Sequence, residues 1–95
     1  MLTISSQLYE ELAGRLLEKI GRDNYFSGSV EISTDDTECK LTASLVIYRT
    51  LLDLPEGAID AIDDIVPVWW EFATIRNGED VINDFSFNDL KEFIF

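Results

Sequence analysis

Two segments in which apolar and polar residues alternate limit this chain to a fold built on an antiparallel sheet. The first runs from Tyr25 to Ser33 and the second from Cys39 to Thr50. Successive side chains of a strand point to opposite faces, so such alternation is typical of strands that bury one face. The short polar run from Thr34 to Thr37 favours a turn between them. The two segments therefore predict an antiparallel hairpin.

A segment with helical periodicity precedes the hairpin. Apolar residues recur at intervals of three and four between Ile4 and Ile20, which is the pattern of an amphipathic helix. Ser5 or Ser6 suits the N-cap, and Gly21 suits the left-handed conformation that ends many helices. We expect a helix here that packs its apolar stripe on the sheet.

The segment from Leu51 to Val66 is harder to assign. Asp53 and Glu56 have the spacing of a capping box, and Pro55 lies between them. Isoleucines follow at roughly helical intervals, although Gly57 disfavours a helix. These features predict a short helix or helical turn.

The last third of the chain predicts two more strands and a helix. Val68 to Ile75 is rich in aromatic and β-branched residues, and Asn77-Gly78 is typical of a type I′ hairpin turn. A short fourth strand is expected to begin at Val81 and Ile82. Ser86 and Asp89 then have capping spacing, which predicts a short C-terminal helix.

Together these elements predict a small single domain of the α+β class that covers residues 1–95. The expected order is α-β-β-(α)-β-β-α, with an antiparallel sheet of about four strands and both terminal helices on one of its faces. The expected core also includes at least one tryptophan. Its other members are apolar residues on the inward sides of these elements: Leu8, Leu12, Leu16, Ile20, Val30, Ile32, Leu41, Leu45, Ile47, Phe72, Phe85 and Leu90.

Charge and composition exclude several classes of function. The formal net charge is -12, from 19 acidic and 7 basic residues, which argues against binding to nucleic acid or to an anionic membrane. The chain has no histidine, and Cys39 is its only cysteine, so the commonest general base and a disulfide are both absent. The N-terminus resembles no secretory signal. We therefore expect a cytoplasmic protein.

The carboxylates offer the main enzymatic hypotheses. Glu71 follows two tryptophans, which suggests a small carboxylate-based hydrolase as the least favoured function. The acidic residues Asp53, Glu56, Asp60, Asp63 and Asp64 form a candidate acidic patch with oxygen ligands of the kind that calcium or magnesium prefers. No window has the spacing of a calcium-binding loop, and a solvated acidic helix face, which needs no ion, explains this patch better. We therefore assign no catalytic, metal or cofactor site and expect a protein that is not an enzyme.

The adjacent Trp69 and Trp70 point to a different function. Neighbouring strand residues face opposite ways, so both rings cannot enter one core. We expect one of them to lie on the uncovered sheet face with Tyr48 and Glu71, as part of a protein–protein interaction surface. The alternative is that residues 51–66 fold over this face and bury it.

The distribution of charge supports a second function. Between Thr50 and Ile75 there are six acidic residues and no basic one. Such a surface suits an acidic inhibitor or DNA mimic that occupies the basic groove of a DNA-handling protein, although it also serves solubility.

Our first hypothesis is a non-catalytic interaction module whose partner is another protein or a second copy of this chain.

Overall fold

The computed structural model describes residues 1–34 and 36–95. Within them a helix, four strands and a second helix follow one another along the chain. Their bounds are α1 Ser6–Ile20, β1 Tyr25–Ser33, β2 Thr37–Leu54, β3 Gly57–Arg76, β4 Glu79–Asp80 and α2 Phe87–Glu92. The predicted α+β class is confirmed.

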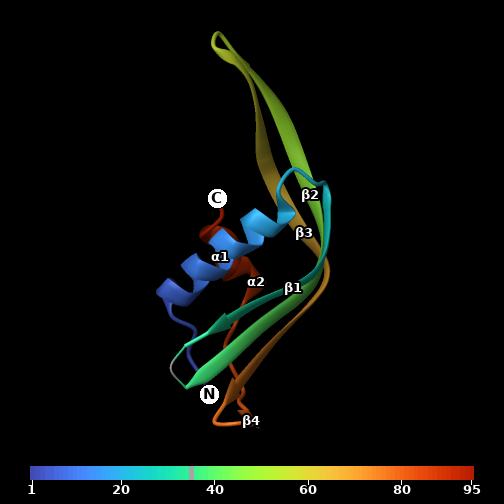
Figure 1. Ribbon diagram of the computed structural model, residues 1–95. Coiled ribbons are helices and arrows are strands. Elements are labelled where there is room, and N and C mark those ends of the chain that lie inside the picture. Colours follow the sequence, from blue (N-terminus) through green and yellow to red (C-terminus); the bar gives the residue numbers. More distant parts are fainter. Residues whose placement is uncertain (35) are drawn as a thin grey trace.

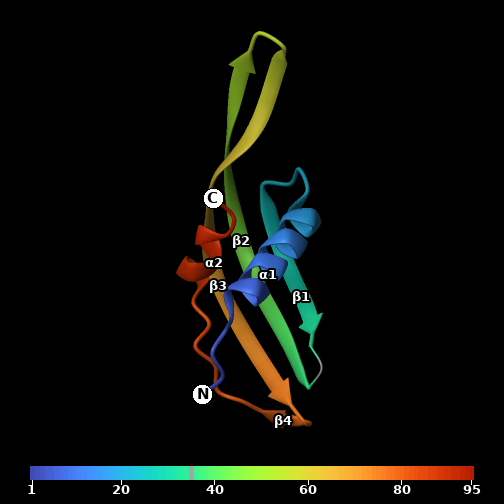
Figure 2. The same ribbon diagram turned by 90° about the vertical axis from the view of Figure 1, so that its left-hand side faces the viewer.

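The strands form one open antiparallel sheet in the order β1-β2-β3-β4. Both helices lie on the same face of this sheet, and the opposite face, which we call the open face, carries neither (Figure 1). β2 and β3 continue as a two-stranded hairpin well beyond β1 and the helices, so that the molecule is 53 Å long (Figure 2). We call this projecting hairpin, residues 49–62, the arm.

The helix caps and the Asn77-Gly78 turn form as the sequence predicts. The Ser5 hydroxyl accepts the Leu8 N–H at the start of α1, and Gly21 ends that helix at φ 55°. Ser86 caps α2 by accepting the Asp89 N–H. Asn77 and Gly78 have φ values of 55° and 78°, as a type I′ turn requires.

Other boundaries differ from the prediction. β2 and β3 are both longer than expected, and β4 lies at Glu79–Asp80, before Val81 and Ile82. The turn between β1 and β2 is closed by the Thr34 N–H, which donates to the Thr37 carbonyl at 2.8 Å. Asp35, which the predicted turn includes, lies outside the described residues.

The predicted helix between Leu51 and Val66 is wrong, because these residues complete β2 and form much of β3. The antiparallel register runs unbroken past Leu51↔Asp60 to Leu54↔Gly57, so strand pairing overrides the local capping signal. Gly57 has a φ of 133°, which suits the tight turn at the tip of the arm. The alternative of a loop folded over the open face is wrong as well.

One of two bulges in β3 explains why the spacing of Ile62 and Ile65 resembles a helix. The register of β3 shifts at Asp63 and again at Val68, where one extra residue is inserted each time. β3 is therefore 20 residues long against 18 in β2. The bulge at Asp63 puts Ile62 and Ile65, three residues apart, on the same face of the strand.

The core lies between the open sheet and its two helices. Leu12, Leu16, Leu45 and Leu90 have no measurable exposure, and nearly all of the predicted core residues are buried. Leu8 is an exception, since it packs against the core while staying partly exposed. The expectation of a tryptophan in the core is wrong, because the rings of Trp69 and Trp70 both reach solvent.

Truncation to alanine should lower the free energy of unfolding at buried aliphatic positions and leave it nearly unchanged at exposed ones. Leu45→Ala removes a completely buried side chain and should lower the free energy of unfolding by about 2–5 kcal/mol. Ile82→Ala, at a site that is 78% exposed, should change it by less than about 0.5 kcal/mol. Urea unfolding followed by circular dichroism measures both, and equal effects would contradict the assigned core.

Candidate functional site

The two adjacent tryptophans lie on opposite faces of β3, as predicted. Trp70 pairs with Ala43 in the register and faces the helices, where its ring meets Phe85 edge-on at 5.2 Å between centroids. Trp70 is nevertheless 40% exposed. β4 pairs only with Ile75 and Arg76, so among the described residues no strand covers the outer edge of β3 beside Trp70. Trp70 is thus a partly covered edge of the core and lies off the open face.

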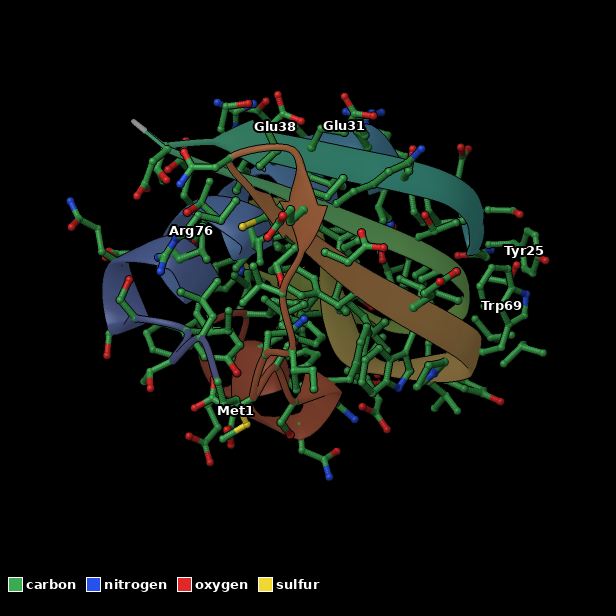
Figure 3. All side chains as sticks on the ribbon, turned by 90° about the horizontal axis from the view of Figure 1, so that it is seen from below. Met1, Tyr25, Glu31, Glu38, Trp69 and Arg76 are labelled. Carbon is green, nitrogen blue, oxygen red and sulfur yellow. The ribbon has the colours of Figure 1, made fainter. Side chains whose placement is uncertain are left out.

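Trp69 lies on the open face with other aromatic side chains. It pairs with Ser44, and the residue is 50% exposed. Tyr25 of β1 and Tyr48 of β2 share this face and are each 55% exposed. Figure 3 shows Tyr25 and Trp69 projecting from the same side of the molecule. The structure therefore brings together two of the predicted surface residues, Tyr48 and Trp69, and adds Tyr25.

The apolar surface continues from the sheet onto the arm. Leu52 and Ile59 pair across the two strands of the arm, on the face that continues the open face. Leu54 follows near the tip. We call the whole set the apolar stripe. It consists of Tyr25, Val46, Tyr48, Leu52, Leu54, Ile59, Val66 and Trp69, which are exposed or half-buried.

The arm members were missed at the sequence level because the segment was expected to be helical. The signal that identifies them is the alternation of Leu52 and Leu54 with Asp53, followed by the Pro55-Glu56-Gly57 turn. Tyr25 also had such a signal, since it heads the polar side of the first alternating segment.

Glu71 shares the open face but lies outside the apolar stripe. It pairs with Thr42, one step along the face from Trp69 and away from the arm. It takes part in none of the ion pairs that join described residues. Arg49 of the neighbouring strand does not pair with Glu71, because its guanidinium lies 3.9 Å from Asp60 on the other face.

The acidic patch does not form one face, which corrects the helical interpretation. On the arm, Asp53 and Asp60 lie on the side of the helices and Glu56 lies at the tip. Asp63 occupies the bulge and accepts the Thr50 hydroxyl, and Asp64 binds Lys91 of α2 at 2.7 Å. Within the described residues, no three Asp, Glu, Cys or His side chains gather closely enough to hold a metal ion.

Arg49 fixes the root of the arm to the body of the protein. Its guanidinium donates to the backbone carbonyls of Gly21 and Asp23, both at 2.9 Å. These carbonyls belong to the connection between α1 and β1. Hydrogen bonds from a charged nitrogen, which are among the stronger ones in proteins, therefore tie the root of the arm to this connection.

The outer edge of β1 is occupied by cationic side chains from α1. Arg15 donates to the Glu31 carbonyl at 3.2 Å and Lys19 donates to the Ser29 carbonyl at 2.8 Å. These contacts block the edge against a further strand. A groove between α1 and β1 is lined by the same side chains, so its two cations are already engaged.

Cys39 lies in the core, where burial raises the pKa of its thiol. A raised pKa lowers the thiolate fraction and with it the reactivity of the sulfur.

No helix within residues 1–34 and 36–95 combines the length and apolar character needed to cross a membrane.

The comparisons with known proteins add no family to this description. No protein-family model matches the chain, and neither the curated proteins nor the solved structures gave a significant match.

The ion pair between Asp64 and Lys91 gives a prediction for pH dependence. The hydrogen bond from Lys91 lowers the pKa of the Asp64 carboxyl below its ordinary value of 3.8, with help from the Ile65 N–H. A lowered folded-state pKa stabilises the protein at higher pH, and this contribution is lost as pH falls below 3.8 through the folded pKa. Lys91→Met should raise the pKa of Asp64 toward its ordinary value.

Carboxyl-carbon NMR titration of the wild-type and Lys91→Met proteins measures this shift. Lys40→Met, at a lysine that pairs with Glu31, is the matched control and should leave the Asp64 pKa at its wild-type value. An unchanged Asp64 pKa in Lys91→Met would contradict the assigned ion pair.

Proposed function

We propose that this protein is a non-catalytic protein–protein interaction module that binds its partner through the apolar stripe on the open face. The observation that carries the proposal is the exposure of Trp69, Tyr25 and Tyr48 on one sheet face without a helix over them. Large aromatic side chains supply much of the binding energy at protein interfaces. Monomeric proteins rarely expose this many large apolar side chains along one face.

The chemistry of the chain supports a binding function over catalysis. It has no histidine, and its one thiol is buried with a raised pKa. Glu71 lies on an exposed sheet face, whereas a catalytic acid works in a site that excludes much of the solvent. A lone unpaired cysteine suits the reducing cytoplasm, where we propose that the protein acts.

An acidic inhibitor or DNA mimic is the second candidate function. It is supported by the arm, whose acidic residues Asp53, Glu56 and Asp60 lie on the helix side and at the tip, away from the apolar stripe. This candidate requires a basic partner. Its complexes should weaken steeply as salt is raised, because screening shortens the reach of exposed charges.

Trp69→Ala tests the interaction module. The tagged wild-type protein and the variant are used to capture partners from the native lysate, and the bound proteins are identified by mass spectrometry. A central interface tryptophan contributes roughly 2 kcal/mol or more, so the variant should bind its partner at least about 30-fold more weakly. Its circular dichroism should be unchanged, because Trp69 lies outside the core.

Ile82→Ala is the matched control, since Ile82 is an exposed aliphatic residue outside the apolar stripe. It should retain the wild-type partners. Undiminished capture by Trp69→Ala would refute the role of the apolar stripe. Loss of capture at high salt with the wild type would instead favour the acidic inhibitor.

A further inference from the structure

We infer that the apolar stripe is covered by a second copy of this chain, in a two-fold dimer in which each arm lies across the open face of the other copy. This inference rests on the proposed function and names the partner.

The arm on its own has little to stabilise it. Its two strands pair with each other, and the helices and β1 end before it (Figure 1). Two-stranded hairpins are at best marginally stable in water without a further layer. Leu52, Leu54 and Ile59 nevertheless place aliphatic side chains on one face of it, each 38–49% exposed. A surface packed on that face would supply the missing layer.

The exposed area is close to what a stable dimer requires. Aromatic and large aliphatic side chains present about 150–250 Å² when fully accessible, so the stripe exposes on the order of 700 Å². A standard interface buries about 800 Å² on each partner, whereas the largest apolar patch of a monomer is typically 300–600 Å². If each copy buries its apolar stripe, the buried area is therefore close to that of a specific dimer interface.

The shape of the apolar stripe suits a symmetric pairing. It extends from Trp69, opposite Ser44, to Leu54, which is roughly 33 Å along β2. Its body half carries the aromatic rings and its arm half carries the aliphatic side chains, with Thr50 near the middle. A two-fold axis there places the arm half of each copy on the body half of the other, as an isologous interface requires.

Most charged residues lie outside this overlap, since Asp53 and Asp60 are on the helix side of the arm. Asp63 and Asp64 lie near its centre, but each is engaged within its own chain: Asp63 accepts the Thr50 hydroxyl, and Asp64 pairs with Lys91 at 2.7 Å. Glu38 and Glu71 share the open face but lie beyond the Trp69 end of the stripe. Two chains of net charge -12 still repel each other, so salt should strengthen the dimer by screening. A basic partner would show the opposite salt dependence.

Sedimentation equilibrium of the full chain over a range of concentrations tests the dimer. The mass should rise from one chain to two, and the dissociation constant should fall when salt is raised. Leu52→Ser should raise the dissociation constant at least about tenfold, because it puts a polar side chain into the interface. Leu51→Ser is the matched control, since Leu51 is 66% exposed on the other face of the arm and should change it little.

A cross-link tests the geometry independently of affinity. Thr50→Cys places a thiol near the proposed two-fold axis, so oxidation should join two chains through the introduced thiols. Glu38→Cys, on the same face at the far end of β2, should not cross-link. The native thiol of Cys39 is buried and does not interfere.

A mass of one chain at every concentration and salt would overturn the inference, as would equal effects of Leu51→Ser and Leu52→Ser. A monomer whose partner capture still depends on Trp69 would refute the dimer and leave the proposed interaction module intact. Binding of a basic protein that weakens with salt would assign the stripe to that partner instead.

Discussion

The antiparallel pairing of β2 with β3 is the constraint on which the rest of the structure depends. It runs the full length of both strands, from Thr37↔Arg76 to Leu54↔Gly57. β1 and β4 add to its two outer edges, and both helices pack against the half that lies nearer the termini (Figure 2). Because the paired strands are longer than these covering elements, the hairpin projects as an arm and its open face stays exposed.

The separation of charge from apolar surface follows from the same pairing. Alternation puts Asp53 and Asp60 on one side of the arm and Leu52 and Ile59 on the other. Asp64, next to the bulge at Asp63, is paired with Lys91 of α2. The net charge of -12 is therefore compatible with an apolar binding surface, because Asp53 and Asp60 lie on the other side of the arm and Glu38 and Glu71 lie beyond the Trp69 end of the stripe.

Much of the fold was predictable, because its signals are local. The periodicity of α1, the alternation in β1 and the first part of β2, and the Asn77-Gly78 turn each reflect the conformational preferences of a few neighbouring residues. The arm was not predictable in this way. Asp53 and Glu56 favour a helix cap locally, and only the continued pairing with β3 overrides that preference.

The sequence by itself determined that Trp69 and Trp70 face opposite ways, because strand side chains alternate whatever surrounds them. It also determined that one face of the sheet would be covered by the two amphipathic helices. Only the tertiary structure decided which tryptophan lies on the open face, and that neither is buried. Only the tertiary structure decided that the apolar stripe extends onto the arm. The extension depends on the register between β2 and β3 and on bulges that no local sequence pattern predicts.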